Sequence, residues 1–172
     1  NINSSTGGIT VGVATATTLV VGTALSTSGA NVGLGTETPR AKLDIVGETR
    51  FEAYSEIVQA VTSSSGEVDL DLSKGQNFEI TTTENITAFN LLNITSGTTR
   101  SYTIKITQNS STPYTVDVDT YRLNGGSELS CNWPGGIVPT VTNVAGKTDI
   151  YSFMTFDGGT TIFGVVGGQN FS

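Results

Sequence analysis

Histidine is absent from this chain, and cysteine occurs only once, at Cys131. Because His performs most acid–base catalysis near neutral pH and most nitrogen ligation of metals, Ser-His-Asp and Cys-His catalysis and a Cys/His zinc site are excluded. A single Cys cannot form a disulfide within the chain, and we expect Cys131 to be a small, partly buried apolar residue rather than a reactive thiol. The composition therefore favours a protein that is not an enzyme and that has no metal or cofactor.

Basic residues and long apolar runs are also scarce. The chain has 8 Lys and Arg against 15 Asp and Glu, which gives a net charge of −7. A nucleic-acid-binding protein is expected to carry a basic patch, and anionic membrane surfaces attract basic segments, so both partners are disfavoured. No apolar run approaches the roughly 20 residues of a membrane-spanning helix, so we expect no membrane insertion.

The abundant residues are those that form strands and turns. Ser and Thr make up roughly a quarter of the 172 residues, and Gly contributes 21. Residues that favour helices are few, and this balance is typical of strand-and-turn proteins. The sequence therefore predicts an all-β fold, in which the only stretch that could form a short helix is 50–61.

The chain divides near residue 48 into two predicted domains. Residues 1–48 contain short apolar pieces separated by Gly, Ser and Thr, and almost no aromatic residues. One copy of this segment would bury too little apolar surface to offset its chain entropy. Because its Val, Ile and Leu content is too high for a disordered linker, we predict an extended, shaft-like segment of short strands that intertwines with identical chains.

Residues 49–172 have the composition of a globular domain and contain all the Phe, Tyr and Trp of the chain. Several runs alternate polar and apolar residues, a period that is typical of half-buried antiparallel strands. With the intervening Gly and Asn turns, they predict an antiparallel β-sandwich of the jelly-roll type, with its best hairpin turn at 157–159. The predicted strands are Glu56–Thr62, Glu67–Asp71, Asn77–Thr82, Ala88–Leu92, Arg100–Thr107, Tyr114–Val118, Asp149–Phe156 and Thr161–Val166.

The most distinctive motif runs from residue 31 to residue 45. Only two glycines of a three-glycine phosphate-binding loop are present and no helical pattern follows, so a phosphate cradle is not indicated. The motif resembles a recurrent sequence of bacteriophage tail-fibre and related virion proteins, where it often lies between a fibrous shaft and the next module. The matching residues are Val32, Gly33, Leu34, Gly35, Thr36, Pro39, Lys42, Leu43, Asp44 and Ile45.

A second stretch, with Trp133-Pro134-Gly135-Gly136 and the segment 149–160, also looks like a module of phage structural proteins, with the character of cyanophage fibre-like proteins. The resemblance implies a homotrimer with a shaft followed by a head. It places the protein in a tail or fibre appendage of the virion, outside the cell once assembled. It further implies a receptor-binding role on host-surface glycans, with other virion proteins bound through the N-terminal segment. The alternative is an assembly component, such as a collar, neck, baseplate or capsid-decorating fibre, that binds other virion proteins and no host receptor.

Three aromatic residues are candidates for contacts with a glycan. Trp133 lies in a loop-like context, where an indole ring can stack on a sugar. Tyr114 and Tyr121 flank the acidic segment 117–119. The alternative for Trp133 is a ring that closes one end of the sandwich or a subunit interface, because large aromatic side chains are mostly buried.

Two pairs of carboxylates are candidates for metal binding or glycoside cleavage. Asp69 and Asp71, and likewise Asp117 and Asp119, are expected on one face of a strand. Such pairs can hold Ca²⁺ together with loop carbonyls, or act as a glycosidase pair. No neighbouring group is evident that would separate their pKa values, so we favour a solvated outer face for both pairs.

Overall fold

The computed structural model describes residues 31–34 and 39–172. The chain separates into two units, with the division between Ala53 and Tyr54, close to the predicted domain boundary. The apolar pieces before residue 31 and the motif residues Gly35 and Thr36 lie outside the described residues. The intertwined shaft therefore stays a prediction.

In the first unit, the tail-fibre-like motif forms two short parallel strands. β1 (Val32–Leu34) pairs with β2 (Leu43–Ile45), and the N–H of Val32 donates to the C=O of Lys42 at 2.8 Å. Pro39 and the bend at residues 40–42 lead into β2.

The turn before β2 is held by an ion pair between Arg40 and Asp44. The Asp44 carboxylate accepts hydrogen bonds from the Arg40 side chain (Nε, 3.0 Å) and from its backbone N–H (2.8 Å). These bonds hold the pKa of Asp44 below its usual range. The acidic residue of the motif therefore fixes the local turn.

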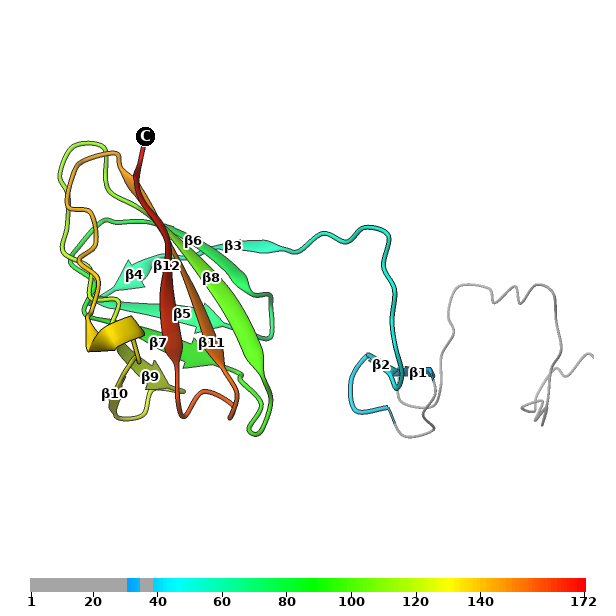
Figure 1. Cartoon of the computed structure of the whole chain (residues 1–172). Coiled ribbons are helices and arrows are strands. Elements are labelled where there is room, and N and C mark those ends of the chain that lie inside the picture. The colour runs from blue at the N-terminus through cyan, green and yellow to red at the C-terminus, as the bar shows by residue number, and fades with distance from the viewer. Residues whose placement is uncertain (1–30, 35–38) are drawn as a thin grey trace, which may run out of the picture. The chain divides into compact units, whose positions relative to one another are not determined.

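The second unit is a sandwich of two five-stranded sheets (Figure 1). One sheet has the order β12-β11-β8-β6-β3 and the other the order β10-β9-β7-β5-β4. The all-β, two-sheet prediction is thus confirmed. The strands are β3 (Val58–Ala60), β4 (Ser63–Ser64), β5 (Glu67–Asp71), β6 (Asn77–Thr81), β7 (Ala88–Leu92), β8 (Arg100–Thr107), β9 (Thr120–Leu123), β10 (Glu128–Ser130), β11 (Thr148–Thr155) and β12 (Phe163–Phe171).

The antiparallel, jelly-roll part of the prediction is wrong. Successive strands from β5 to β9 alternate between the two sheets, so every second strand becomes a parallel neighbour. β3, β6 and β8 pair in parallel in one sheet, and β5, β7 and β9 do so in the other. Antiparallel pairs among the described strands are β4–β5, β9–β10, β8–β11 and β11–β12. The alternation of polar and apolar residues indicates which face of a strand is buried. It carries no information about whether the neighbouring strand is parallel or antiparallel.

Most predicted strands occur close to their expected ends, and the exceptions lie in the second half. Residues 114–118 form no strand, and only Val116 makes a single bridge, to Ile86. β9, β10 and the two-residue strand β4 were not predicted, and β12 runs on to residue 171. The segment 50–61 contains β3 rather than a helix, and the one helical turn of the described residues is a 3₁₀ turn, η1 (Pro134–Gly136).

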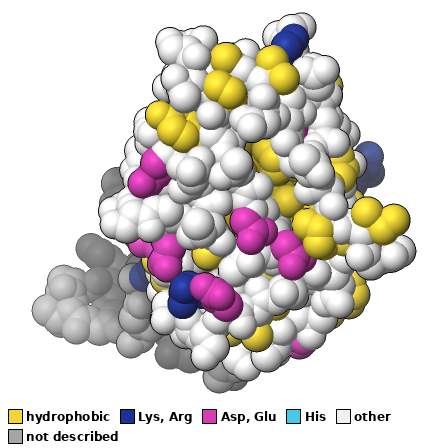
Figure 2. Space-filling view, turned by 90° about the vertical axis from the view of Figure 1, so that its left-hand side faces the viewer, with side chains coloured by type: hydrophobic (Ala, Val, Ile, Leu, Met, Phe, Trp, Pro, Cys, Tyr) yellow, Lys and Arg dark blue, Asp and Glu magenta, His cyan; other side chains and the backbone are white. Residues whose placement is uncertain are grey.

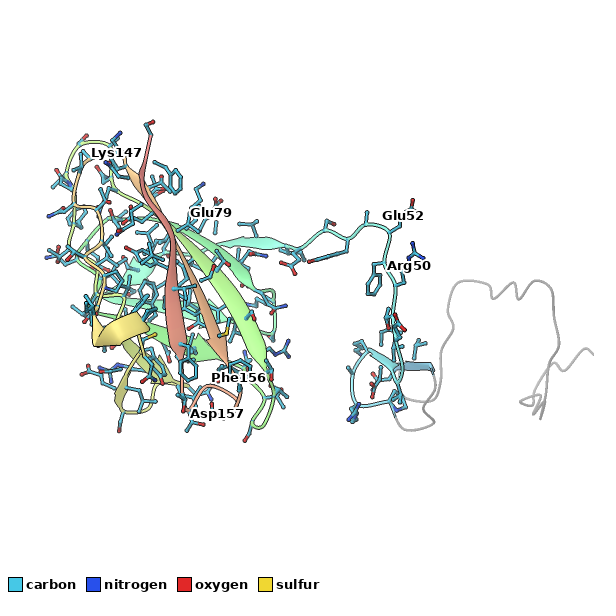
Figure 3. All side chains as sticks on the ribbon, in the orientation of Figure 1. Arg50, Glu52, Glu79, Lys147, Phe156 and Asp157 are labelled. Atoms are coloured by element: carbon cyan, nitrogen blue, oxygen red, sulfur yellow. The ribbon has the colours of Figure 1, made fainter. Side chains whose placement is uncertain are left out.

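The core lies between the inner faces of the two sheets. Tyr102 of β8 stacks on Phe153 of β11, with ring centroids 5.1 Å apart. Burying one side chain of this size contributes roughly 1.5–3 kcal/mol. Lys147 before β11 and Phe156 after it mark opposite ends of the sandwich (Figure 3). The aliphatic and aromatic residues exposed by 3% or less are Val68, Leu70, Leu72, Phe78, Ile80, Ile86, Ala88, Phe89, Leu91, Ile104, Ile106, Tyr151 and Ile162.

The β11–β12 loop, which contains the predicted turn, packs closely against another loop at Gly158. This residue has a φ of 78°, and a Cβ there would lie 2.6 Å from the Cα of Ser96 and 2.7 Å from the carbonyl oxygen of Thr95. We predict that Gly158→Ala lowers the free energy of unfolding by about 3 kcal/mol, because both the backbone conformation and the contact become strained. Chemical denaturation measures the loss.

Gly97→Ala is the matched control. Gly97 also has a left-handed backbone, with a φ of 71°, but nothing lies within 4 Å of the position that an added methyl group would take. It should lose only about 1–2 kcal/mol, the cost of the backbone conformation alone. Equal losses for the two variants would contradict the close approach of the loops at Gly158.

Candidate functional site

Trp133, the first candidate for a sugar contact, belongs to the core and is only 7% exposed. Its ring packs edge-to-face against Tyr151 and Phe153, with centroids 6.1 and 5.7 Å away. Its Nε1 donates a hydrogen bond to Asp119 Oδ1 at 3.0 Å. This placement disagrees with the exposed ring that sugar stacking requires, and it matches the alternative in which the ring closes the sandwich.

The other two aromatic candidates do not join Trp133 on an exposed surface. Tyr121 of β9 is also in the core, and its hydroxyl donates to the C=O of Thr160 at 3.1 Å. Tyr114 is half-buried and lies outside the core cluster. The three residues were grouped by residue type and loop context, which carry no information about burial.

A shallow groove of about 290 Å³ remains beside the Trp133 loop. It runs between residues 132–134 and the first residues of β12, and Gly164 of that strand lies directly against the indole. The exposed apolar walls of the groove are Phe163 and Val165, which are 44% and 43% exposed. Phe163, rather than Trp133, is therefore the aromatic ring that a ligand in this groove would meet.

The predicted carboxylate pair at residues 117 and 119 lies in a turn rather than on a strand face. Asp117 accepts hydrogen bonds from the N–H groups of Asp119 (2.8 Å) and Thr120 (3.1 Å), and Asp119 accepts the bond from Trp133. The placement on a strand face is thus wrong, because both carboxylates shape the turn that leads into β9. Asp117 is nevertheless exposed to solvent, as expected.

The pair on β5 has separate partners. Asp69 accepts a hydrogen bond from the side-chain amide of Asn90 at 2.9 Å. Asp71 accepts bonds from the amide of Asn93 (2.8 Å) and the hydroxyl of Ser73 (2.7 Å), and these hold the pKa of Asp71 well below its usual range. Within residues 31–34 and 39–172, no group of three His, Cys, Asp or Glu side chains is placed to hold a metal ion.

Two buried polar side chains that the sequence analysis missed hold the loops at one end of the sandwich. Gln108, just after β8, is 2% exposed. Its Nε2 donates to the carbonyl oxygens of Tyr114 and Thr142, both at 2.9 Å, and its Oε1 accepts from the N–H of Tyr114 at 2.9 Å. One amide therefore ties the loops 109–117 and 137–147 to the end of β8.

Asp149, the second buried polar residue, is 1% exposed and lies on the inner side of β11. Its carboxylate accepts from the N–H groups of Thr142 (2.7 Å) and Asn170 (2.8 Å) and from the hydroxyl of Tyr151 (3.1 Å). Burial raises the pKa of Asp149, but the two backbone donors outweigh it, so the pKa lies below its usual range. The only signal in the sequence was a charged residue at an inward position of an alternating strand.

The thiol of Cys131 lies in the core. Cys131 is 8% exposed, and burial raises its pKa to about 12, so the interpretation as a small buried residue is confirmed. Among the described residues, no helix has the length and apolarity that a membrane crossing requires. Figure 2 shows one face of the sandwich, on which acidic side chains outnumber basic ones and lie among apolar groups.

No protein-family model, no curated protein and no solved structure matches the chain. By its fold, the chain is an all-β protein with a sandwich of two five-stranded sheets.

The burial of Trp133 leads to a first prediction for this region. Trp133→Ala should lower the free energy of unfolding by about 3–5 kcal/mol, because it empties a core position and leaves Asp119 without its indole donor. Phe163→Ala is the control, because Phe163 is exposed, and it should cost about 1 kcal/mol or less. Thermal and denaturant unfolding measure both. A fully stable Trp133→Ala protein would show that the ring is not part of the core.

Asp149 leads to a prediction about pH. Because its pKa in the folded state is depressed, its stabilising effect is present above the unfolded-state pKa of about 3.9 and is lost as the pH falls through the folded-state value. Asp149→Asn should cost about 3 kcal/mol at pH 7, since an amide cannot accept all the bonds that the carboxylate accepts. The substitution should also remove the part of the acid-induced loss of stability that protonation of Asp149 causes.

Asp69→Asn is the control for Asp149→Asn, because Asp69 is an exposed carboxylate with one amide donor. It should keep nearly the wild-type stability at neutral pH, to within about 0.5 kcal/mol. Denaturant unfolding at a series of pH values measures all three proteins. If Asp149→Asn follows the wild-type curve, the buried carboxylate does not hold the loops.

Proposed function

We propose that this chain is a non-catalytic structural protein of a bacteriophage virion, namely a segment of a homotrimeric fibre that takes part in attachment to the host surface. The motif at residues 31–45 and the segment around Trp133 support this through their resemblance to tail-fibre proteins. The all-β fold and the absence of His from the sequence are consistent with it. The proposal includes the location in the virion, the homotrimer and the binding of a host receptor.

The observation that carries the proposal is the exposed apolar surface of the described part of the first unit, residues 31–34 and 39–53. β1 and β2 have three residues each, and a two-stranded sheet of this size is marginal in water. Leu43, Val46 and Phe51 are 54%, 56% and 65% exposed. A segment with these features needs apolar partners, and three identical copies around an axis supply them to one another.

A second candidate function, that of an assembly component binding other virion proteins, is favoured by the exposed side of the β11–β12 hairpin. Met154, Phe156, Phe163 and Phe171 are between 39% and 62% exposed there. Phe156 and Phe163 contact each other edge-to-face, with centroids 6.3 Å apart. Apolar residues on an edge strand suit a protein partner.

The solution mass of the full chain tests the proposed function. Light scattering coupled to size exclusion should give a mass three times that of the 17.9 kDa chain. Leu43→Lys and Phe51→Lys should shift the protein toward the monomer, because each buries a charge in the expected interface. A wild-type monomer would overturn the fibre proposal.

Thr49→Lys is the matched control, because it adds the same charge at an exposed polar position of the same unit and should leave the mass unchanged. Antibodies against the chain that label a fibre on virions would separate a phage protein from other surface adhesins. Purified protein that blocks phage adsorption would support attachment, whereas binding to virions without such blocking would favour the assembly role.

A further inference from the structure

Arg100, the first residue of β8, is a cation without a protein partner in the described part of the chain. Its Nε is shielded from solvent and has no hydrogen-bond acceptor. Lys74, Lys105 and Arg122 in the same unit each lie 3.2–3.3 Å from a carboxylate oxygen, although the Nε of Arg122 is likewise shielded and without a hydrogen bond. Arg100 is half-buried and has no ion pair with a described residue, so the terminal nitrogens of its guanidinium are available to an anion from outside the chain.

Arg100 lines a pocket of about 320 Å³. Ser73, Lys74 and Gln76, from the connection between β5 and β6, line the same pocket. Its volume lies at the lower end of the range of roughly 300–1,000 Å³ for small-molecule sites. The pocket therefore has room for one small ligand, and most of the side chains named here are polar.

Lys74 can supply a second positive charge to this pocket. Its ion pair with Asp71 has a distance of 3.3 Å, and its side chain is 71% exposed. An exposed ion pair of this kind contributes little to stability. Asp71 also has donors of its own in Asn93 and Ser73, so it does not depend on Lys74. A ligand can therefore attract Lys74 away from Asp71 at little cost.

One negative charge limits what the pocket can hold. Glu56 also lines it, and its Oε2 accepts a hydrogen bond from the amide of Asn77 at 2.5 Å. Asp71 balances the charge of Lys74 and Glu56 offsets that of Arg100, so the four charged groups sum to zero. The pocket therefore suits a monoanion better than a dianion. Glu56 and Gln76 can also accept hydrogen bonds from hydroxyl groups.

We propose that this pocket binds a single carboxylate or sulfate-ester group on a small polyhydroxylated ligand, which is the chemistry of an acidic sugar unit. The Arg100 guanidinium takes two oxygens of the anion side by side, and Lys74 adds a third donor. Ser73, Gln76 and Glu56 pair with the hydroxyls. A role of this pocket in host attachment rests on the proposed function. The binding of an acidic sugar to the pocket is tested on the purified chain alone.

The test is a titration of the full chain, labelled with ¹⁵N, with glucuronate, galactose 6-sulfate and neutral glucose, followed by NMR. We expect one or both acidic sugars to bind with a Kd of about 1 mM and to shift the backbone amide signals of Gly75, Gln76 and Arg100. Glucose should not. Binding of glucuronate alone assigns a carboxylate ligand, and binding of the sulfated sugar alone assigns a sulfate ester.

Two substitutions decide whether Arg100 is responsible. Arg100→Gln should weaken binding of the acidic sugar by about tenfold or more, as for the loss of a charge-assisted pair. Lys105→Gln is the control, because it removes another β8 cation, which pairs with Glu79 outside the pocket, and it should leave the affinity unchanged. Arg100→Gln should also unfold at the same or a higher denaturant concentration than the wild type, because it removes an unpaired charge.

Three results would overturn the proposal. They are the absence of binding up to about 10 mM of either acidic sugar, undiminished binding by Arg100→Gln, and a loss of stability in Arg100→Gln that reveals a structural partner for this residue. None of these results bears on the solution mass of the chain. A failure of this site is therefore distinguishable from a failure of the fibre proposal.

Discussion

Strands β5, β6, β8 and β11 each bury one face in a core that both sheets share, and the rest of the second unit depends on this constraint. Because successive strands from β5 to β9 lie in opposite sheets, neither sheet has a hydrophobic interior without the other. Tyr102 and Phe153 from neighbouring strands and the indole of Trp133 complete the same core. The loops at the ends are then positioned by strand ends that cannot shift independently.

Buried hydrogen bonds hold the loops that apolar packing does not position. The 137–147 loop has exposed apolar residues at its start, Ile137 and Val138, and is held by the buried Gln108 and Asp149, which bind the two sides of Thr142. The turn before β9 is held in a similar way by Asp117 and Asp119. The carboxylates of Asp117 and Asp119 that suggested metal chemistry or glycoside cleavage are thus occupied by hydrogen bonds within the chain. Arg100, in contrast, has no ion pair with a described residue, and its Nε has no hydrogen bond.

The fold class and most strand positions were predictable because alternating polarity is a local property. The strands β5, β7 and β8 begin and end where the pattern predicts. Strand direction was not predictable, because it depends on which sheet each connection enters. The exposure of Trp133 depends on Gly164, a residue distant in sequence that makes room for the ring. Likewise, the pocket at Arg100 joins residues near 56, 74 and 100, which no spacing in the sequence connects.

The alternation of strands between the sheets also has a consequence for how the domain folds. Glu67 pairs with Ala88 and Asn77 with Thr103, so the central ladders join segments that are far apart along the chain. No local hairpin can nucleate these ladders. Each ladder can form only after the intervening strand has entered the other sheet. Domains dominated by such distant contacts fold slowly and expose unpaired strands while they do so. The C-terminal strand β12 carries no charged residue that would oppose its pairing with another copy. Association with other copies before folding is complete therefore competes with folding.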